Sequence, residues 1–217
     1  ACSSNNGKTG PDVKPVPPVQ KETGIEIGKV LPAWQKGEMD IHFINTTTGE
    51  CAFLIMPDGT QMLIDAASSL IATNSNGSTT NTGIRSRWDP TKTGTRGSVL
   101  IANYLKKCMA WTGNNTIDYI VNTHLHNDHF GDCNSSLPVS GNSSTYRLNG
   151  IPEILDLFPV SRVIDRGWPS YDYPFDMQTL ASNQAAVKNY VNAVKWHVEN
   201  KGLKAELFKA GVTNQIV

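Results

Sequence analysis

The chain has 217 residues, which suits one domain of ordinary size with a tail and allows a substantial core. Its 19 basic and 19 acidic residues cancel, so the net charge gives no reason to expect nucleic acid or an anionic membrane surface as a partner. No apolar run approaches the roughly 20 residues that a membrane-spanning helix needs, which leaves a small molecule as the expected partner.

The first 24 residues predict an extended tether rather than a folded element. Residues 7–24 contain four prolines and few apolar side chains, a composition typical of linkers. Ala1 followed by Cys2 resembles the junction of a bacterial lipoprotein, where a small residue precedes the cysteine that receives lipid after signal cleavage. We therefore expect lipid attachment at Cys2 and an exported protein, periplasmic or on the cell surface, whose membrane contact is that anchor. An ordinary N-terminus with a chance cysteine is the alternative.

Three short strands are expected at the start of a domain that spans residues 25–217. The candidate strands are Met39–Asn45, Cys51–Met56 and Gln61–Asp65. The sequence Pro57-Asp58-Gly59 favours a tight turn between the second and the third, since proline presets φ and glycine accepts positive φ. Asp65 therefore ends the third strand.

A long polar segment, residues 68–97, follows these strands. Loops of this length often line a functional site. Arg85 and Arg87 lie in its second half and are candidates for holding an anionic or choline-like group. The alternative is that both are solvated loop charges. An amphipathic helix is expected next, over residues 98–111.

The strongest signal follows a short apolar strand at Ile117–Val121. Four metal-binding side chains come directly after it: His124, His126, Asp128 and His129. Three of the five histidines of the chain thus fall within six residues. Residues two apart on an extended segment point the same way, so His124 and His126 can share one cation. Imidazole and carboxylate are ligands that zinc prefers.

The pattern His-x-His-x-Asp-His after an apolar strand resembles the signature of the metallo-β-lactamase superfamily. The earlier strands resemble the opening strands of that fold, and their sequences are most similar to the competence-protein and phosphorylcholine-esterase branch. The resemblance implies an α/β protein with an αββα sandwich, of which this chain holds mainly the first half. Two places depart from the branch: Thr46-Thr-Thr-Gly-Glu50 replaces a Gly-Gln-Gly-Asp-like turn, and Asp65-Ala-Ala67 replaces Asp-x-Gly.

The resemblance also implies a ligand set. His124 and His126 would hold one ion, and Asp128 and His129 a second, with Asp128 also orienting the attacking water. Asp65 would support the loop by accepting a hydrogen bond from a ligating histidine, a contact that such ligands need. Zinc is the expected metal, as two ions where the site is complete, with iron or manganese as alternatives.

The remainder of the chain predicts a helix, a strand, an aromatic loop and a long helix. The helix is expected over residues 151–158 and the strand over Val160–Asp165. The next loop carries Trp168, Tyr171 and Tyr173, which would form a wall over the site because the loop follows a strand. Aromatic faces also suit quaternary ammonium groups. Packing of these side chains as local core is the alternative. A long helix is expected over Leu180–Lys201, with His197 on its flank as a structural residue, and strand pieces at Leu203–Leu207 and Gln215–Val217.

These observations predict a metal-dependent hydrolase that uses a metal-activated water, with phosphoesters as the favoured substrates. A β-lactam, lactone or thioester hydrolase is the alternative among enzymes, and a non-catalytic surface-binding lipoprotein is the alternative outside them. Since the chain resembles mainly the first half of the fold, we expect the domain to be incomplete at its C-terminus and the isolated chain to be a poor catalyst.

Overall fold

The computed structural model describes residues 27–46, 49–68, 72–73, 79–80, 96–179 and 183–217. The chain divides into two compact units, Ala1–Pro32 and Ala33–Val217. The described residues of the first unit, 27–32, are exposed and form a turn and a short connection. Cys2 and the predicted tether lie outside the described residues. The second unit carries all the structure discussed below.

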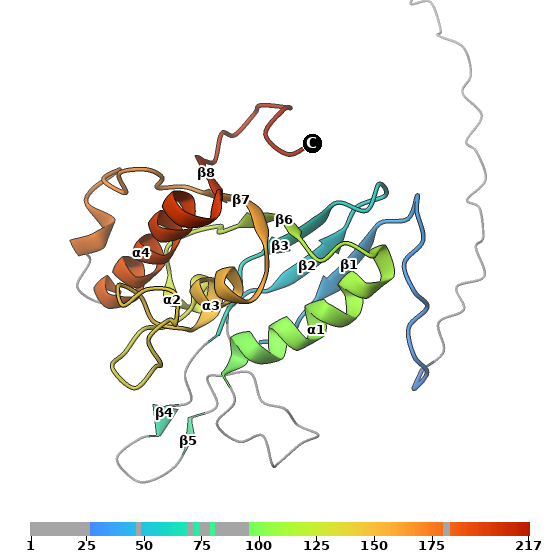
Figure 1. Ribbon diagram of the computed structural model, residues 1–217, viewed down its shortest axis with the longest axis horizontal. Helices are drawn as coiled ribbons and strands as arrows, with labels where there is room; N and C mark the ends of the chain where they lie inside the picture. Colours follow the sequence, from blue (N-terminus) through green and yellow to red (C-terminus); the bar gives the residue numbers. More distant parts are fainter. Residues whose placement is uncertain (1–26, 47–48, 69–71, 74–78, 81–95, 180–182) are drawn as a thin grey trace, which may run out of the picture. The chain divides into compact units, whose positions relative to one another are not determined.

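The second unit is built around a six-stranded mixed sheet (Figure 1). The first three strands pair antiparallel, and the others join them in parallel. In spatial order the strands are β1 (Asp40–Phe43), β2 (Ala52–Ile55), β3 (Gln61–Ile64), β6 (Ile117–Val121), β7 (Val160–Asp165) and β8 (Lys204–Leu207). A separate short pair consists of β4 (Ala72–Thr73) and β5 (Thr79–Thr80).

The three longer helices of the described residues follow the predicted positions closely, whereas a four-residue helix and a 3-10 turn were not predicted. The helices are α1 (Gly97–Thr112), α2 (Asn127–Phe130), α3 (Gly150–Leu157) and α4 (Gln184–Lys201), with a 3-10 turn η2 (Met177–Thr179). None of the helices in this part of the chain combines the length and the apolar character needed to cross a bilayer. The predicted strand at residues 215–217 is wrong, because these residues form a bend and irregular structure.

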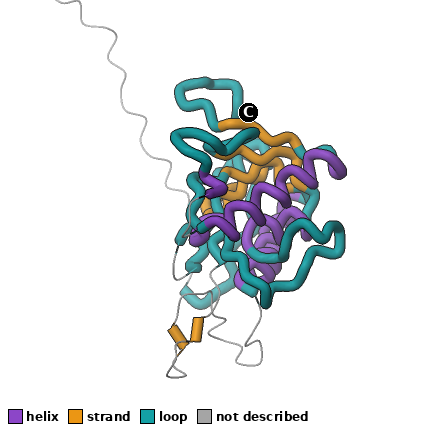
Figure 2. Tube along the Cα trace, turned by 90° about the vertical axis from the view of Figure 1, so that its left-hand side faces the viewer, coloured by secondary structure: helices purple, strands orange, loops and turns teal. Residues whose placement is uncertain are grey.

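The core lies between the sheet and one layer of helices. Figures 1 and 2 show α1, α3 and α4 on the same side of the sheet. Alternate strand residues such as Phe53, Leu63 and Ile120 pack against helix residues such as Leu105 and Tyr190. The predicted α/β class is therefore confirmed, with a helical layer packed on the six-stranded sheet.

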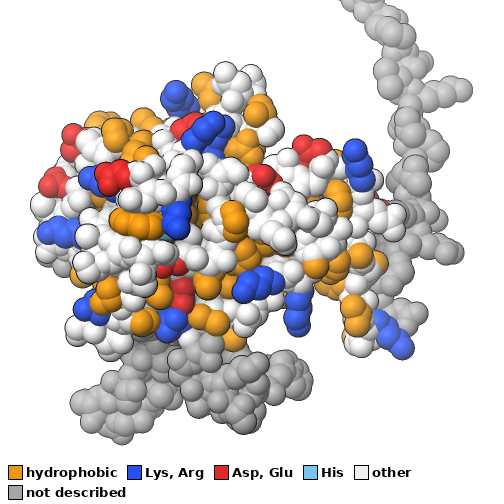
Figure 3. Space-filling model, viewed as in Figure 1, with side chains coloured by type: hydrophobic (Ala, Val, Ile, Leu, Met, Phe, Trp, Pro, Cys, Tyr) orange, Lys and Arg blue, Asp and Glu red, His pale blue; other side chains and the backbone are white. Residues whose placement is uncertain are grey.

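The opposite face of the sheet carries a second apolar cluster. Its buried members are Leu54, Met62, Tyr119, Val121 and Ile164. The C-terminal segment contacts this face, since the Tyr119 hydroxyl donates to the Val217 carbonyl at 2.8 Å. On the molecular face drawn in Figure 3, basic and acidic side chains are interspersed, as the balanced net charge suggests.

The parallel strands determine where the site forms. β3, β6 and β7 run in the same direction and are neighbours in the sheet. Their carboxyl ends therefore meet at one edge, and the segments that leave them lie side by side. Asp65 follows β3, Thr123 and His124 follow β6, and Asp165 is the last residue of β7. This edge brings together residues far apart in the sequence.

Candidate functional site

The histidine loop joins the end of β6 to the short helix α2. His126 has extended backbone dihedrals, φ −109° and ψ 144°, and the helix begins at the next residue. The turn of α2 is closed by hydrogen bonds from the His129 amide to the His126 carbonyl, 2.9 Å, and from the Gly131 amide to the Asn127 carbonyl, 2.8 Å. Asp128 and His129 are thus placed on a helical turn, while His124 and His126 precede it on extended backbone.

Glycine is required where this loop meets α3. Gly131 has φ +111°, and a Cβ atom added there would lie 2.8 Å from the Cα atom of Gly150. Gly150 also has positive φ, and its added Cβ would lie 2.0 Å from the Phe130 carbonyl oxygen. Any larger residue at either position would push α3 away from the loop.

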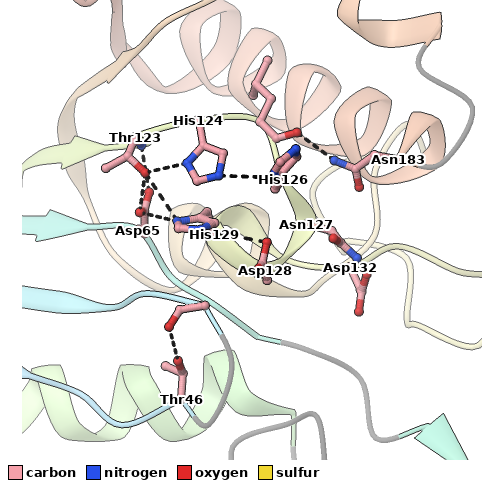
Figure 4. Close-up of polar contacts among 12 residues, drawn as sticks. Thr46, Asp65, Thr123, His124, His126, Asn127, Asp128, His129, Asp132 and Asn183 are labelled. Atoms are coloured by element: carbon pink, nitrogen blue, oxygen red, sulfur yellow. Dashed lines mark hydrogen bonds and ion pairs between the residues drawn. The ribbon is translucent and has the colours of Figure 1, made fainter.

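The four side chains predicted to bind metal lie near one another (Figure 4). His124 Nε2 lies 3.1 Å from His126 Nδ1. The rings of His124 and His129 have centroids 3.9 Å apart. His129 Nε2 lies 3.9 Å from Asp128 Oδ1, and the Asp128 side chain is 45% exposed. The donors therefore form two neighbouring pairs, one on the extended segment and one on α2.

Asp65, directly after β3, contacts this cluster. It is fully buried and has φ 55°, a backbone conformation that non-glycine residues adopt rarely. Its carboxylate accepts from the Thr123 amide at 2.8 Å, from the Thr123 hydroxyl at 2.7 Å and from His129 Nδ1 at 2.7 Å. These contacts have the geometry that the predicted supporting role of Asp65 needs.

The carboxylate of Asp65 fixes the tautomer of His129. A carboxylate accepts hydrogen bonds and an ionised one cannot donate them, so His129 Nδ1 carries a proton. In the neutral ring, Nε2 is then the nitrogen with a free lone pair, and it faces Asp128 rather than Asp65. Burial lowers the pKa of His124, and the neighbouring His129 and His126 lower it further, against the opposing effect of Asp65 and Asp128. The neutral ring that results is the form that binds metals.

Each of the two donor pairs offers two of the ligands that a metal site needs. In the part of the chain that the structure describes, no group of three or more His, Cys, Asp or Glu side chains is arranged to hold an ion. Two nitrogens bound to one tetrahedral zinc lie about 3.3 Å apart, given zinc–nitrogen bonds of about 2.0–2.1 Å. The His124–His126 separation of 3.1 Å agrees with two corners of such a site. The Asp128–His129 pair is wider, and each pair needs further ligands.

Residues 112–199 match the family model of the metallo-beta-lactamase superfamily. The matched region runs from the end of α1 into α4 and contains the whole histidine loop. Together with the mixed α/β architecture, the match is consistent with a metallo-β-lactamase-type fold and indicates a metal-dependent hydrolase in general. It specifies neither the branch nor the substrate. The search of curated proteins found no match.

The region matched to the superfamily also contains contacts that sequence reasoning missed. Thr123 contacts Asp65, His124 and His129, and its only signal in the sequence is its position directly before the first histidine. Asn183, at the start of α4, donates to the Leu125 carbonyl at 2.8 Å, a contact 58 residues apart that no local pattern indicates.

Gly49, which precedes β2, lies directly against the loop. Gly49 has φ +75°, and a Cβ added there would lie 1.7 Å from the Asp128 carbonyl oxygen. The Ala66 amide donates to the His129 carbonyl at 2.7 Å. The backbone of the loop is therefore approached closely by Gly49 and is hydrogen bonded to the segment after β3.

The residues predicted to bind substrate divide into three groups. Arg85 and Arg87 lie outside the described residues. Tyr171 is fully buried and its hydroxyl donates to Asp165 at 2.7 Å, so the prediction that it lines a substrate wall is corrected: it belongs to the core. Trp168 is half-buried and meets Tyr171 edge-on, whereas Tyr173 is 78% exposed. Of the three aromatics, Tyr173 offers the most open face.

His197 lies outside the histidine cluster, in agreement with its interpretation as a structural residue. It is buried on α4, with Nδ1 2.9 Å from the Ala193 carbonyl and Nε2 3.3 Å from Asp156 Oδ1. Asp156 also accepts hydrogen bonds from Ser140 and Tyr146 at 2.6 Å each. Asp156 of α3 therefore links His197 on α4 to the segment that contains Ser140 and Tyr146.

Proposed function

We propose that the protein is a metallo-hydrolase that acts on phosphoesters. In this proposal His124 and His126 hold one divalent ion, and Asp128 and His129 hold a second. The observation that carries it is the donor pair of His124 Nε2 and His126 Nδ1, 3.1 Å apart, with a second donor pair beside it whose histidine is fixed by a buried carboxylate. Nothing in the packing of a core requires imidazoles in this arrangement.

Zinc is the metal that this donor set favours. Neutral imidazole nitrogens and a carboxylate suit a borderline divalent cation, and iron or manganese are the alternatives. When bound here, such an ion supplies Lewis acidity and lowers the pKa of a coordinated water towards neutrality. The protein's part is to hold the donors and to exclude alternative orientations of the rings.

Individual side chains have distinct parts in this proposal. Asp65 holds His129 with its proton on Nδ1, so Nε2 stays free towards the site. Asp128 has a partly exposed carboxylate, which can accept a hydrogen bond from the attacking water and so orient it. Asp65 is fully buried and already accepts three hydrogen bonds from Thr123 and His129, so it is not placed to take that part itself.

Two features support phosphoesters as the substrate class. Two adjacent donor pairs suit a site with two ions, which stabilises both the attacking and the leaving oxygens of a displacement at phosphorus. The loop after β7 leaves the same edge of the sheet as the histidine loop, because Val121 and Ile164 are neighbours in the register. On that loop Tyr173 and Phe175 are exposed, and such aromatic faces suit a quaternary ammonium group such as choline.

The test is a panel of substrates offered to the metal-loaded full chain: bis-p-nitrophenyl phosphate, nitrocefin and a lactone. We expect hydrolysis of the phosphodiester, lost in Asp128→Asn and retained in Asp172→Asn, whose exposed carboxylate lies on the loop after β7. Hydrolysis of nitrocefin or the lactone alone would show that the substrate class is wrong. If the metal-loaded protein hydrolyses none of the three, the hydrolase proposal itself is contradicted.

A further inference from the structure

The hydroxyl of Thr123 lies between the buried carboxylate and two of the histidine rings. Thr123 Oγ1 is 2.7 Å from Asp65 Oδ2, 3.2 Å from His124 Nδ1 and 3.4 Å from His129 Nδ1. His129 Nδ1 is itself 2.7 Å from the same carboxylate oxygen. His129 therefore reaches Asp65 directly, whereas for His124 the hydrogen-bonded path to Asp65 runs through the threonine (Figure 4).

Counting donors and acceptors fixes the direction of this chain of contacts. An ionised carboxylate only accepts, so the Thr123 hydroxyl proton points to Asp65. The lone pairs of Oγ1 then remain available to accept from His124 Nδ1–H. A neutral His124 with its proton on Nδ1 has its free lone pair on Nε2, which is the atom 3.1 Å from His126 Nδ1.

We propose that Thr123 is a positioning residue, whose hydroxyl extends the hold of Asp65 to His124. One buried carboxylate then orients one histidine in each donor pair: His129 directly and His124 through the threonine. The part of this proposal that concerns metal affinity rests on the proposed function. The part that concerns the tautomer of His124 is independent of any metal.

The backbone makes the threonine suited to this task. Its amide donates to Asp65 Oδ1 at 2.8 Å while its hydroxyl donates to Oδ2, so two bonds to one carboxylate fix the residue. The Asp65 amide in turn donates to the Val121 carbonyl at 2.9 Å, which ties the carboxylate to the end of β6. Thr123 is exposed, so loss of its hydroxyl leaves no cavity in the core.

The chain contains a matched control. Thr60 contacts Asp58 through the same two bonds, amide to Oδ1 at 2.9 Å and hydroxyl to Oδ2 at 3.0 Å, in the exposed β2–β3 turn. The experiment compares Thr123→Val, which removes the hydroxyl and keeps the shape, with Thr123→Ser, which keeps the hydroxyl, and with Thr60→Val. Two readouts are used: the histidine tautomers in the metal-free protein by nitrogen NMR, and the zinc affinity by competition with a chelator.

The wild-type protein should show His124 protonated on Nδ1 and not on Nε2. Thr123→Val should lose this preference and bind zinc about 10–100-fold more weakly, as is usual when a partner of a ligating histidine is removed. Thr123→Ser should stay within about threefold of the wild type, and Thr60→Val should be unchanged.

Three results would overturn the proposal: His124 without a proton on Nδ1 in the wild type, equal zinc affinity in Thr123→Val and the wild type, or an equal loss in the valine and serine variants. The first needs no variant, so it applies even if a substitution impairs folding. Failure of the wild type itself to bind zinc would count against the proposed function, whereas the tautomer of His124 would still decide the role of Thr123.

Discussion

Replacement of Gly49 by alanine tests whether the β1–β2 turn supports the histidine loop. Gly49 has φ +75°, and an added Cβ would lie 1.7 Å from the carbonyl oxygen and 2.7 Å from the carbonyl carbon of Asp128. Both are backbone atoms, so no side chain can rotate away to relieve the contact. Either the turn or the loop that carries Asp128 must move.

Two energetic terms add for this substitution. The positive φ costs an L-residue roughly 1–2 kcal/mol. Since observed Cβ contacts are almost never below 3.0 Å, the backbone must separate by more than an ångström, and overpacking of this kind costs about 1–3 kcal/mol. Gly49→Ala should therefore lower the free energy of unfolding by about 2–5 kcal/mol.

Gly113→Ala is the control, because it isolates the first term. Gly113 ends α1 with φ +70°, and an added Cβ would meet nothing within 4 Å. It should cost about 1–2 kcal/mol and leave zinc affinity unchanged. Urea denaturation gives the stabilities, and chelator competition gives the affinities. Equal destabilisation by the two substitutions, or an unchanged zinc affinity in Gly49→Ala, would refute the idea that this turn holds the loop.

Three further outcomes are expected. Asp65→Asn should weaken zinc binding about 10–100-fold in chelator competition, because the amide can accept at only one of the two positions that serve Thr123 and His129. Wild-type affinity would contradict this. Asp128→Asn should lose most hydrolysis with its melting temperature nearly unchanged, since the side chain is 45% exposed; wild-type turnover would contradict it. Burial opposes ionisation of Asp156, but hydrogen bonds led by the one from His197 outweigh it and lower the pKa of Asp156 from 3.8 to about 2. In urea titrations the free energy of unfolding should therefore fall as the pH is lowered from about 4 to about 2, and it should fall less in Asp156→Asn.

The sequence predicted most of the elements because their periodicities are strong. Short apolar runs bounded by turn residues placed β1, β2, β3, β6 and β7 within a few residues, and the helical spacing of apolar residues did the same for α1, α3 and α4. The strand expected at residues 215–217 is absent. Instead, Gln215 is buried by polar contacts, with its side chain bonded to the Lys209 amide and the Leu207 carbonyl. The short sequence at residues 215–217 gives no indication of these contacts.

The site was predictable to the extent that its residues are adjacent in the chain. The four candidate ligands lie within six residues, so their spacing alone suggested that neighbouring side chains share an ion. The contacts that orient it join residues far apart: Asp65 and Thr123 are 58 apart, and Leu125 and Asn183 also 58. Tyr171 was misplaced for the same reason, since an aromatic on a loop gives no sign that a buried aspartate lies within reach of its hydroxyl.

Two buried carboxylates at the ends of parallel strands organise this edge of the sheet. Asp65, after β3, binds the backbone and hydroxyl of Thr123 and the ring of His129. Asp165, at the end of β7, accepts hydrogen bonds from the hydroxyls of Tyr171 and Tyr190 at 2.7 and 2.8 Å. Burial and the neighbouring Asp165 both raise the pKa of Tyr171, so its hydroxyl keeps its proton and remains a donor.

The two carboxylates anchor different segments on either side of β6. The contacts of Asp65 fix the histidine loop, and those of Asp165 fix the start of the loop after β7 through the amides of Gly167 and Trp168, both at 2.8 Å. The two segments are therefore tied to the sheet through separate carboxylates. Asp165→Asn should then alter the loop that carries Tyr173 and leave the His124–His126 pair intact, because no hydrogen bond among the described residues joins that pair to Asp165. Nitrogen NMR of the two histidines checks this, and changed His124 and His126 signals in Asp165→Asn would contradict it.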